Sequence, residues 1–178
     1  MIHFVGAGPG AADLITIRGA KLLGAADVVI YAGSLVNPDL LEYAKPGCEL
    51  YNSAEMTLEE VLNVMEASER AGKTTARLHS GDPCLYGAVR EQTDALDKRG
   101  LAWDMTPGAS SFCGAAAALG VEYTLPGVSQ SVILTRSPGR TPVPDTERLR
   151  LLAAHGASMA LFLSAGALDA APESVRRL

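Results

Sequence analysis

The 178-residue chain has few cysteines, few aromatic residues and no excess of positive charge, and these shortages exclude several classes of protein. Its three cysteines, Cys48, Cys84 and Cys113, are far apart and form neither a disulfide framework nor zinc-ligand spacing, so we expect reduced thiols and no metal. Fifteen Lys and Arg against twenty Asp and Glu give a net charge of −5, which argues against broad nucleic-acid binding. No run of about 18 apolar residues occurs, and the N-terminal residues lack a signal-peptide pattern. We therefore expect a cytoplasmic protein with no nucleic-acid or membrane partner.

Apolar runs typical of strands alternate with amphipathic runs typical of helices. Val28–Tyr31 is a β-branched run of the first kind. Thr57-Leu58-Glu59-Glu60 is a capping box and predicts a helix that ends at Ala71-Gly72. The alternation indicates an α/β fold with mostly parallel sheets. The other expected strands are residues 2–5, 49–51, 74–79, 102–105, 132–135 and 158–163, the last of them buried, and the other expected helices are residues 16–26, 39–44, 88–98, 110–119, 146–154 and from 167 onward.

The composition changes near Pro107-Gly108. Nine basic and fifteen acidic residues precede position 110, whereas six basic and five acidic residues follow it. The change predicts an N-terminal α/β domain, residues 1–108, and a C-terminal α/β domain, residues 109–178.

Three glycine-containing loops follow expected strands, where parallel sheets bind ligands. Residues 6–11 match the G-x-G-x-x-G/A dinucleotide pattern, but the next helix begins only near Thr16 and no acidic residue ends the second strand. In residues 80–87, Asp82 suits either a helix cap or a functional carboxylate. In residues 107–111, serine hydroxyls suit either ligand contacts or capping of the following helix.

Taken together, these loops resemble those of the tetrapyrrole methylases, which transfer methyl groups from S-adenosylmethionine (SAM) to porphyrin-like macrocycles. Residues 31–36, 79–83, 130–136 and 139–144 look like the branch that methylates C11 of precorrin-4 in cobalamin biosynthesis. The resemblance runs along essentially the whole chain. It implies a two-lobed fold, S-adenosylhomocysteine (SAH) as product, a tetrapyrrole substrate and a homodimer. Because family members extend past the position of Leu178, we expect an incomplete second lobe.

The resemblance also implies site residues. Asp82 is the candidate catalytic residue, positioning substrate or taking up a ring proton. Arg136 and Arg140 are candidates for binding the macrocycle's carboxylates, since guanidinium forks suit such groups, although solvated surface is the alternative. The implied cofactor-binding residues are Pro9, Gly81, Asp82, Leu85, Tyr86, Ser110, Ser111 and Phe162.

Other functions stay open at this point. The chain could methylate uroporphyrinogen III, precorrin-3 or a diphthamide precursor, could be a NAD-binding oxidoreductase, or could be a non-catalytic tetrapyrrole-binding or dimerisation fragment. Methyl transfer from a sulfonium requires alignment in a dry pocket rather than an enzyme nucleophile. That requirement agrees with the scattered positions of His3, His79 and His155, which we expect to be structural.

Overall fold

The computed structural model of the chain describes residues 1–139 and 141–164. The chain divides into two compact units, Met1–Ala115 and Ala116–Leu178. The sequence predicted the division earlier, after Gly108. None of the helices in the described ranges is both long and apolar enough to cross a membrane.

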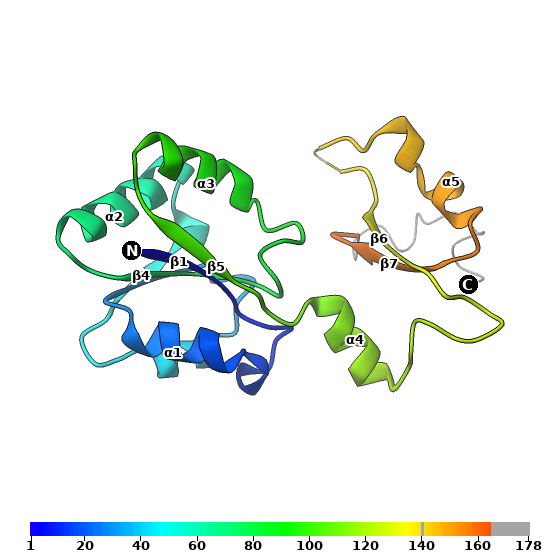
Figure 1. Cartoon of the computed structure of the whole chain (residues 1–178), viewed down its shortest axis with the longest axis horizontal. Coiled ribbons are helices and arrows are strands. Elements are labelled where there is room, and N and C mark those ends of the chain that lie inside the picture. The colour runs from blue at the N-terminus through cyan, green and yellow to red at the C-terminus, as the bar shows by residue number, and fades with distance from the viewer. Residues whose placement is uncertain (140, 165–178) are drawn as a thin grey trace. The chain divides into compact units, whose positions relative to one another are not determined.

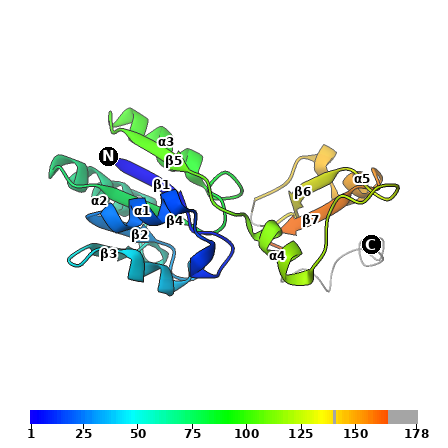
Figure 2. The same ribbon diagram turned by 60° about the horizontal axis from the view of Figure 1, so that its bottom comes forward.

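The first unit is built on a parallel sheet of five strands in the order β3-β2-β4-β1-β5, with β3 at one edge and β5 at the other (Figure 2). Adjacent strands β4, β1 and β5 end together, since Val5 pairs with Leu78 on one side and Thr106 on the other. Their carboxyl ends therefore share one edge of the sheet. The strands are β1 (Ile2–Gly6), β2 (Val28–Tyr31), β3 (Glu49–Asn52), β4 (Thr75–His79) and β5 (Trp103–Thr106).

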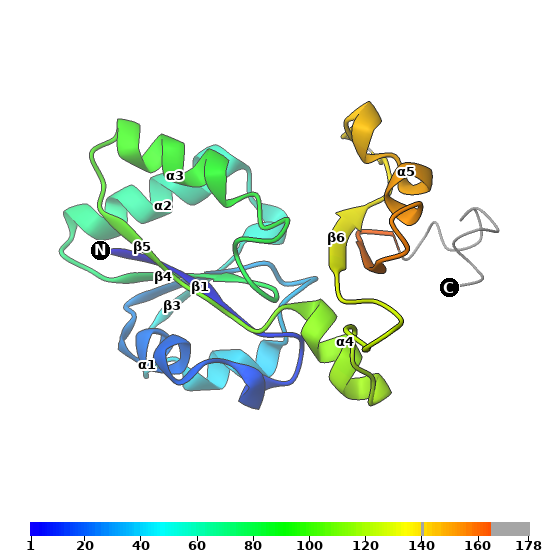
Figure 3. The ribbon, with the colours of Figure 1, turned by 45° about the vertical axis from the view of Figure 1, so that its right-hand side comes forward.

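Helices cover both faces of this sheet. Helix α1 (Ile17–Ala25) lies on one face, and α2 (Leu58–Arg70) and α3 (Val89–Lys98) lie on the other (Figures 1 and 3). Side-chain caps start two of them: Thr16 accepts a hydrogen bond from the Gly19 N–H in α1, and the expected capping box opens α2. The helix expected over residues 39–44 is instead a 3₁₀ helix, Pro38–Tyr43, and two shorter 3₁₀ helices are Ala12–Leu14 and Ser53–Glu55.

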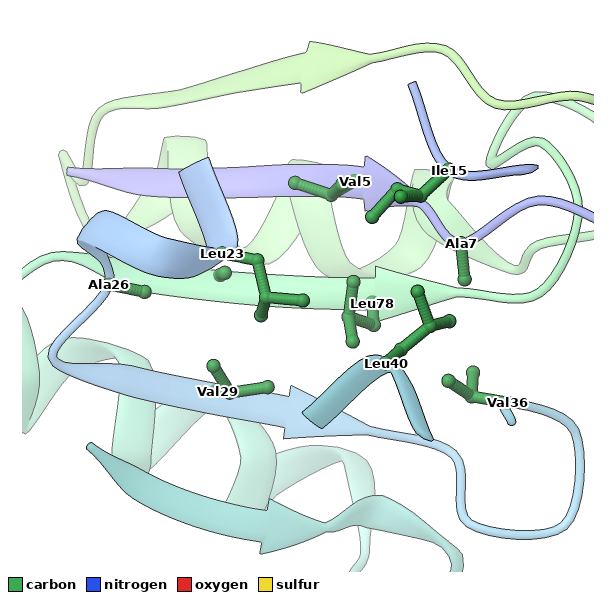
Figure 4. Close-up of a cluster of buried hydrophobic side chains, with 10 residues drawn as sticks. Val5, Ala7, Ile15, Leu23, Ala26, Val29, Val36, Leu40 and Leu78 are labelled. Atoms are coloured by element: carbon green, nitrogen blue, oxygen red, sulfur yellow. The ribbon is translucent and has the colours of Figure 1, made fainter. Parts of the chain in front are cut away.

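The core has two parts, one on each face of the sheet. On the α1 face, side chains from β1, β2 and β4 meet those of α1 and of the 3₁₀ helix Pro38–Tyr43 (Figure 4). On the other face, strand residues pack against α2 and α3. Fully burying such aliphatic side chains contributes about 1.5–3 kcal/mol each, so both faces hold the strand ends in place. The α1-face cluster includes Val5, Ala7, Ile15, Leu23, Ala26, Val29, Val36, Leu40, Ala76 and Leu78.

In the second unit, strands β6 (Val132–Arg136) and β7 (Ser158–Phe162) pair in parallel. The expected helix over residues 146–154 is wrong in extent, because Arg148 has extended backbone angles and its guanidinium bonds to Asp145. A 3₁₀ helix, Asp145–Glu147, is followed by the short helix α5 (Leu149–Ala153). The last strand, expected to be buried, is half-buried along its length, because the described residues give its sheet only two strands. The helix expected from residue 167 lies outside the described residues.

Candidate functional site

The three glycine-containing loops of the first unit meet at the shared carboxyl edge of β4, β1 and β5. A Cβ added to Gly6 would lie 2.4 Å from the backbone N of Gly108 and 2.8 Å from the carbonyl oxygen of Gly81. A Cβ added to Gly108 would lie 2.2 Å from that same oxygen. These distances leave no room for a side chain, so the loops pack backbone against backbone.

Backbone hydrogen bonds join the first loop to the second. Gly8 and Gly81 exchange two bonds, of 3.2 Å from the Gly8 N–H and 2.9 Å from the Gly81 N–H. Both residues have positive φ angles, +82° and +63°, which glycine adopts without strain. The G-x-G pattern of the first loop therefore serves this bridge, in addition to close packing at Gly6.

Asp82 joins the second loop to the third. One carboxylate oxygen accepts the Cys84 N–H at 2.8 Å, and the other accepts the Gly108 N–H at 3.0 Å. Partial burial alone would raise the pKa of this carboxyl, but the hydrogen bonds from Cys84 and Gly108 outweigh it and lower the pKa below its usual value. Asp82 is thus held ionised as a tie between two loops, and its catalytic role stays a prediction.

Replacing Asp82 separates these roles. Asp82→Ala removes two acceptors of backbone N–H groups, and we expect it to lower the free energy of unfolding by about 0.5–2 kcal/mol, as for loss of a cap. If Asp82 also has the catalytic role that the family resemblance implies, methyl transfer should fall much further than the folded fraction. Chemical denaturation measures the folded fraction, and a SAM-dependent methylation assay on the same preparation measures activity. Asp82→Asn, which keeps one acceptor, is the matched variant. If activity follows the folded fraction in both variants, the role of Asp82 is to hold the second loop to the third and not to take part in the reaction.

The second loop ends in a strained turn, residues 86–88. Tyr86 and Ala88 have φ angles of 55° and 48°, in the left-handed region that side chains disfavour. A Cβ on Gly87 would lie 2.4 Å from the carbonyl oxygen of Pro83, so the turn folds tightly back on the loop. Leu85 is half-buried and Tyr86 is 43% exposed. Strain of this kind persists where surrounding contacts over-determine the backbone, as at binding sites.

The third loop leads into α4 (Ser111–Leu119). Ser110 is buried, and its carbonyl accepts the N–H groups of Cys113 and Gly114 at the start of this helix. Ser111 is exposed. Pro9 of the first loop packs on the same helix, since a Cβ on Gly114 would lie 2.5 Å from the Pro9 Cβ. The expected residues Pro9, Gly81, Asp82, Ser110 and Ser111 therefore belong to one loop cluster.

The remaining expected site residues belong to the second unit. Phe162 ends β7 in register with Arg136 at the end of β6. The Arg136 guanidinium donates to the carbonyls of Thr141 and Pro142, both at 2.9 Å, and so shapes the loop after its own strand. Arg140 lies outside the described residues.

A polar network under the second loop was missed by the sequence analysis. The buried Arg77 donates from Nε to the Gln92 side-chain oxygen (3.2 Å) and from Nη1 to the Ser53 hydroxyl (2.9 Å), and burial lowers its pKa to about 10. His79, two residues along β4, is buried, and its Nε2 has no hydrogen-bond partner among the residues that the structure describes. Burial and the nearby Arg77 charge lower its pKa to about 3. The available signal was the i, i+2 spacing of two basic residues in a strand whose other residues are threonine, alanine and leucine.

The charge of the loop cluster distinguishes between ligands. Residues 6–11, 80–87 and 107–111 contain no Lys or Arg, and Asp82 is their only charged residue. A diphosphate would find no cationic side chain in these loops, whereas a cationic ligand meets one carboxylate. The start of α1 at Ile17, beyond a 3₁₀ turn, likewise places no helix N-terminus directly after the first loop. The cluster thus fits a sulfonium better than a dinucleotide.

The acidic residue next to β2 in the sequence lies at the wrong end of that strand for a ribose ligand and is bound to other groups of the protein. Asp27 lies at the amino end of that strand, bound to the Lys45 ammonium at 2.6 Å and to the Thr74 N–H at 2.8 Å. The dinucleotide pattern requires an acidic residue at the opposite end of the strand. A nicotinamide dinucleotide site is therefore not supported.

Comparison with known proteins agrees with this geometry. The family model of the tetrapyrrole (corrin/porphyrin) methylases matches residues 1–178. The chain therefore belongs to the tetrapyrrole methylases, and its α/β architecture with parallel sheets is that of the family.

Several curated relatives of the chain are named precorrin-4 or cobalt-precorrin-4 C(11)-methyltransferases. It is 55% identical over 168 residues to a cobalt-precorrin-4 C(11)-methyltransferase of Methanocaldococcus jannaschii, covering 94% of this chain and 65% of the relative. It is 47% identical over 178 residues to a precorrin-4 C(11)-methyltransferase of a Sinorhizobium species, covering 99% and 70%. The chain thus spans about two thirds of the length of these relatives.

Solved structures give the same placement. The crystal structure of a cobalt precorrin-4 methyltransferase superposes with a TM-score of 0.88 at 50% identity, covering 92% of this chain and 68% of that one. A uroporphyrin-III C-methyl transferase of Thermus thermophilus, complexed with S-adenyl homocysteine, has a TM-score of 0.75 at 26% identity, covering 98% and 71%. The family resemblance inferred from the loop motifs is confirmed.

Proposed function

We propose that this chain carries the loop cluster of a SAM-dependent methyltransferase that methylates C11 of precorrin-4 or its cobalt form, in cobalamin biosynthesis. The observation that carries the proposal is the close-packed edge of β4, β1 and β5, whose loops hold one negative charge and no positive one. The 44–55% identity to several precorrin-4 methyltransferases supports C11 over other positions.

Each loop contributes differently to the proposed site. SAM supplies an electrophilic methyl group on a cationic sulfonium, which a ring carbon of the macrocycle can accept. Asp82 holds the second loop to Gly108 and adds a negative charge beside a cationic ligand. Leu85 and Tyr86 present apolar and aromatic surface, which excludes water. Pro9, Gly81, Ser110 and Ser111 complete the proposed contacts of the first unit. Phe162, which belongs to the second unit, stays a prediction of the family resemblance.

Carboxylates of the macrocycle require cations, which the loops of the first unit lack. We assign this role to Arg136 and Arg140, because Arg136 ends β6 and Arg140 follows it four positions later in the sequence. Arg136→Lys should raise the substrate KM by roughly tenfold while leaving SAM affinity unchanged, since lysine cannot reproduce the guanidinium fork. If steady-state kinetics give Arg136→Lys the wild-type KM, the only role of Arg136 is to hold the loop after its own strand.

Ligand titration tests the proposed function. Calorimetry with SAM, SAH, NAD and phosphate-bearing nucleotides should give binding of SAM and SAH only. Mass spectrometry of reactions with precorrin-4, precorrin-3 and uroporphyrinogen III should show one added methyl group on precorrin-4. Methylation of another macrocycle would mean that the chain is a methyltransferase with a different substrate. Tetrapyrrole binding without SAM binding would indicate a non-catalytic fragment. Sedimentation of the same sample tests the homodimer that the family resemblance implies, and cell fractionation tests the proposed cytoplasmic location.

A further inference from the structure

The Arg77 guanidinium is buried in the first unit with neutral hydrogen-bond partners. Its bonds go to the Ser53 hydroxyl and the Gln92 side-chain oxygen, and no carboxylate pairs with it among the described residues. A buried cation without a counter-charge is costly compared with an apolar side chain of similar size. The cost of burying this guanidinium suggests that its hydrogen bonds hold a neighbouring part of the chain in place.

The guanidinium determines the orientation of the Gln92 amide. Arginine has only donors, so the amide oxygen must face Arg77 and the NH2 group must face the other way. That NH2 group donates to the carbonyl of Ala88 at 3.1 Å. The pair Arg77–Gln92 thus connects the middle of β4 to the end of the second loop.

The acceptor of this bond belongs to the strained turn. Ala88 precedes α3 with a φ of 48°, and no side chain caps the helix there. Tyr86, two residues earlier, has a φ of 55°. Non-glycine residues hold such angles when neighbouring contacts fix them, and the Gln92 bond is one such contact.

We propose that Gln92, oriented by Arg77, is a positioning residue that holds residues 86–88 in the conformation that binds cofactor. The inference rests on the proposed function, which assigns Leu85 and Tyr86 to the cofactor site. Gln92 acts through the turn and does not itself contact the ligand.

Gln92→Glu tests this, because it keeps the hydrogen bond from Arg77 and removes the hydrogen bond to the Ala88 carbonyl. The carboxylate still accepts from Arg77, and gives it a counter-charge, but it cannot donate to Ala88. We expect an unchanged or higher melting temperature together with faster hydrogen exchange in the peptide covering residues 84–90. The SAH dissociation constant should rise roughly three- to tenfold, the usual effect of one hydrogen bond.

Ser53→Ala is the matched control, since it removes the other bond to Arg77, together with the bond from the Ser53 hydroxyl to the Tyr31 carbonyl, without touching the turn. It should lower the melting temperature and leave both the exchange of residues 84–90 and the SAH affinity unchanged. Unchanged exchange in Gln92→Glu, or faster exchange with unchanged SAH affinity, would overturn the proposal. If the wild-type chain binds no SAH, the proposed function fails, and the exchange data alone decide whether Gln92 positions the turn.

Discussion

Gly108→Ala is expected to lower the free energy of unfolding of the first unit by about 3 kcal/mol, the upper range for forcing extra atoms into a packed site. The added Cβ would lie 2.2 Å from the Gly81 carbonyl oxygen and 2.8 Å from the Gly6 Cα. Both neighbours are backbone atoms of adjacent strand ends, so relief requires moving a loop rather than rotating a side chain. Urea denaturation followed by fluorescence of Trp103, the one tryptophan of the chain, measures the change.

The same substitution should also weaken the proposed SAM binding in the protein that remains folded. A shifted Gly108 no longer donates well to Asp82, so the second loop loses its tie to the third. Gly139→Ala is the control, because its Cβ meets no described residue within 4 Å, and we expect its stability change to be within about 0.5 kcal/mol. A Gly108→Ala protein as stable as Gly139→Ala would contradict the close packing of the three loops.

Local sequence patterns were enough to predict most elements of the first unit. The capping box at Thr57 and the β-branched run Val28–Tyr31 depend on neighbours in the sequence, and both were predicted correctly. The helix over residues 146–154 was predicted wrongly, because extended angles at Arg148 break a segment of helical composition. Only contacts outside the local sequence show that break.

The candidate site was predictable in part for the same reason. Parallel strands end at one edge, so the three loops could be expected to meet there. The order of the strands in the sheet could not be predicted. The close contact of Gly6 with Gly108 and the hydrogen bond from Gly108 to Asp82 could not be predicted either, because they join residues far apart in the sequence, 26 positions for the hydrogen bond. The partners of the buried Arg77 could not be predicted either, since Ser53 and Gln92 look like ordinary polar residues in the sequence.

Mild acid should destabilise the first unit through His79. Burial and the nearby Arg77 hold its folded-state pKa near 3, against an ordinary value of 6.5. A pKa that is lower in the folded state means that the unfolded chain binds the proton more readily, so stability is complete above about pH 6.5 and is lost as the pH falls towards 3. Each pH unit in this window is worth about 1.4 kcal/mol, so the free energy of unfolding should fall by about 2 kcal/mol between pH 6.5 and pH 5.

Denaturation series at several pH values, followed by Trp103 fluorescence, measure this slope. His79→Phe should flatten it, because an aromatic ring that does not titrate can pack against Phe4, whose ring centroid lies 5.7 Å from that of His79. Ser68→Ala is the control: it breaks a buried hydrogen bond to Thr75 at the other end of β4 and should lower stability equally at every pH. Carboxylates begin to titrate below about pH 5, so the comparison is made above that value. An equal slope in His79→Phe and wild type would mean that the pKa of His79 is the same in the folded protein as in the unfolded chain, and the acid sensitivity would then belong to other groups.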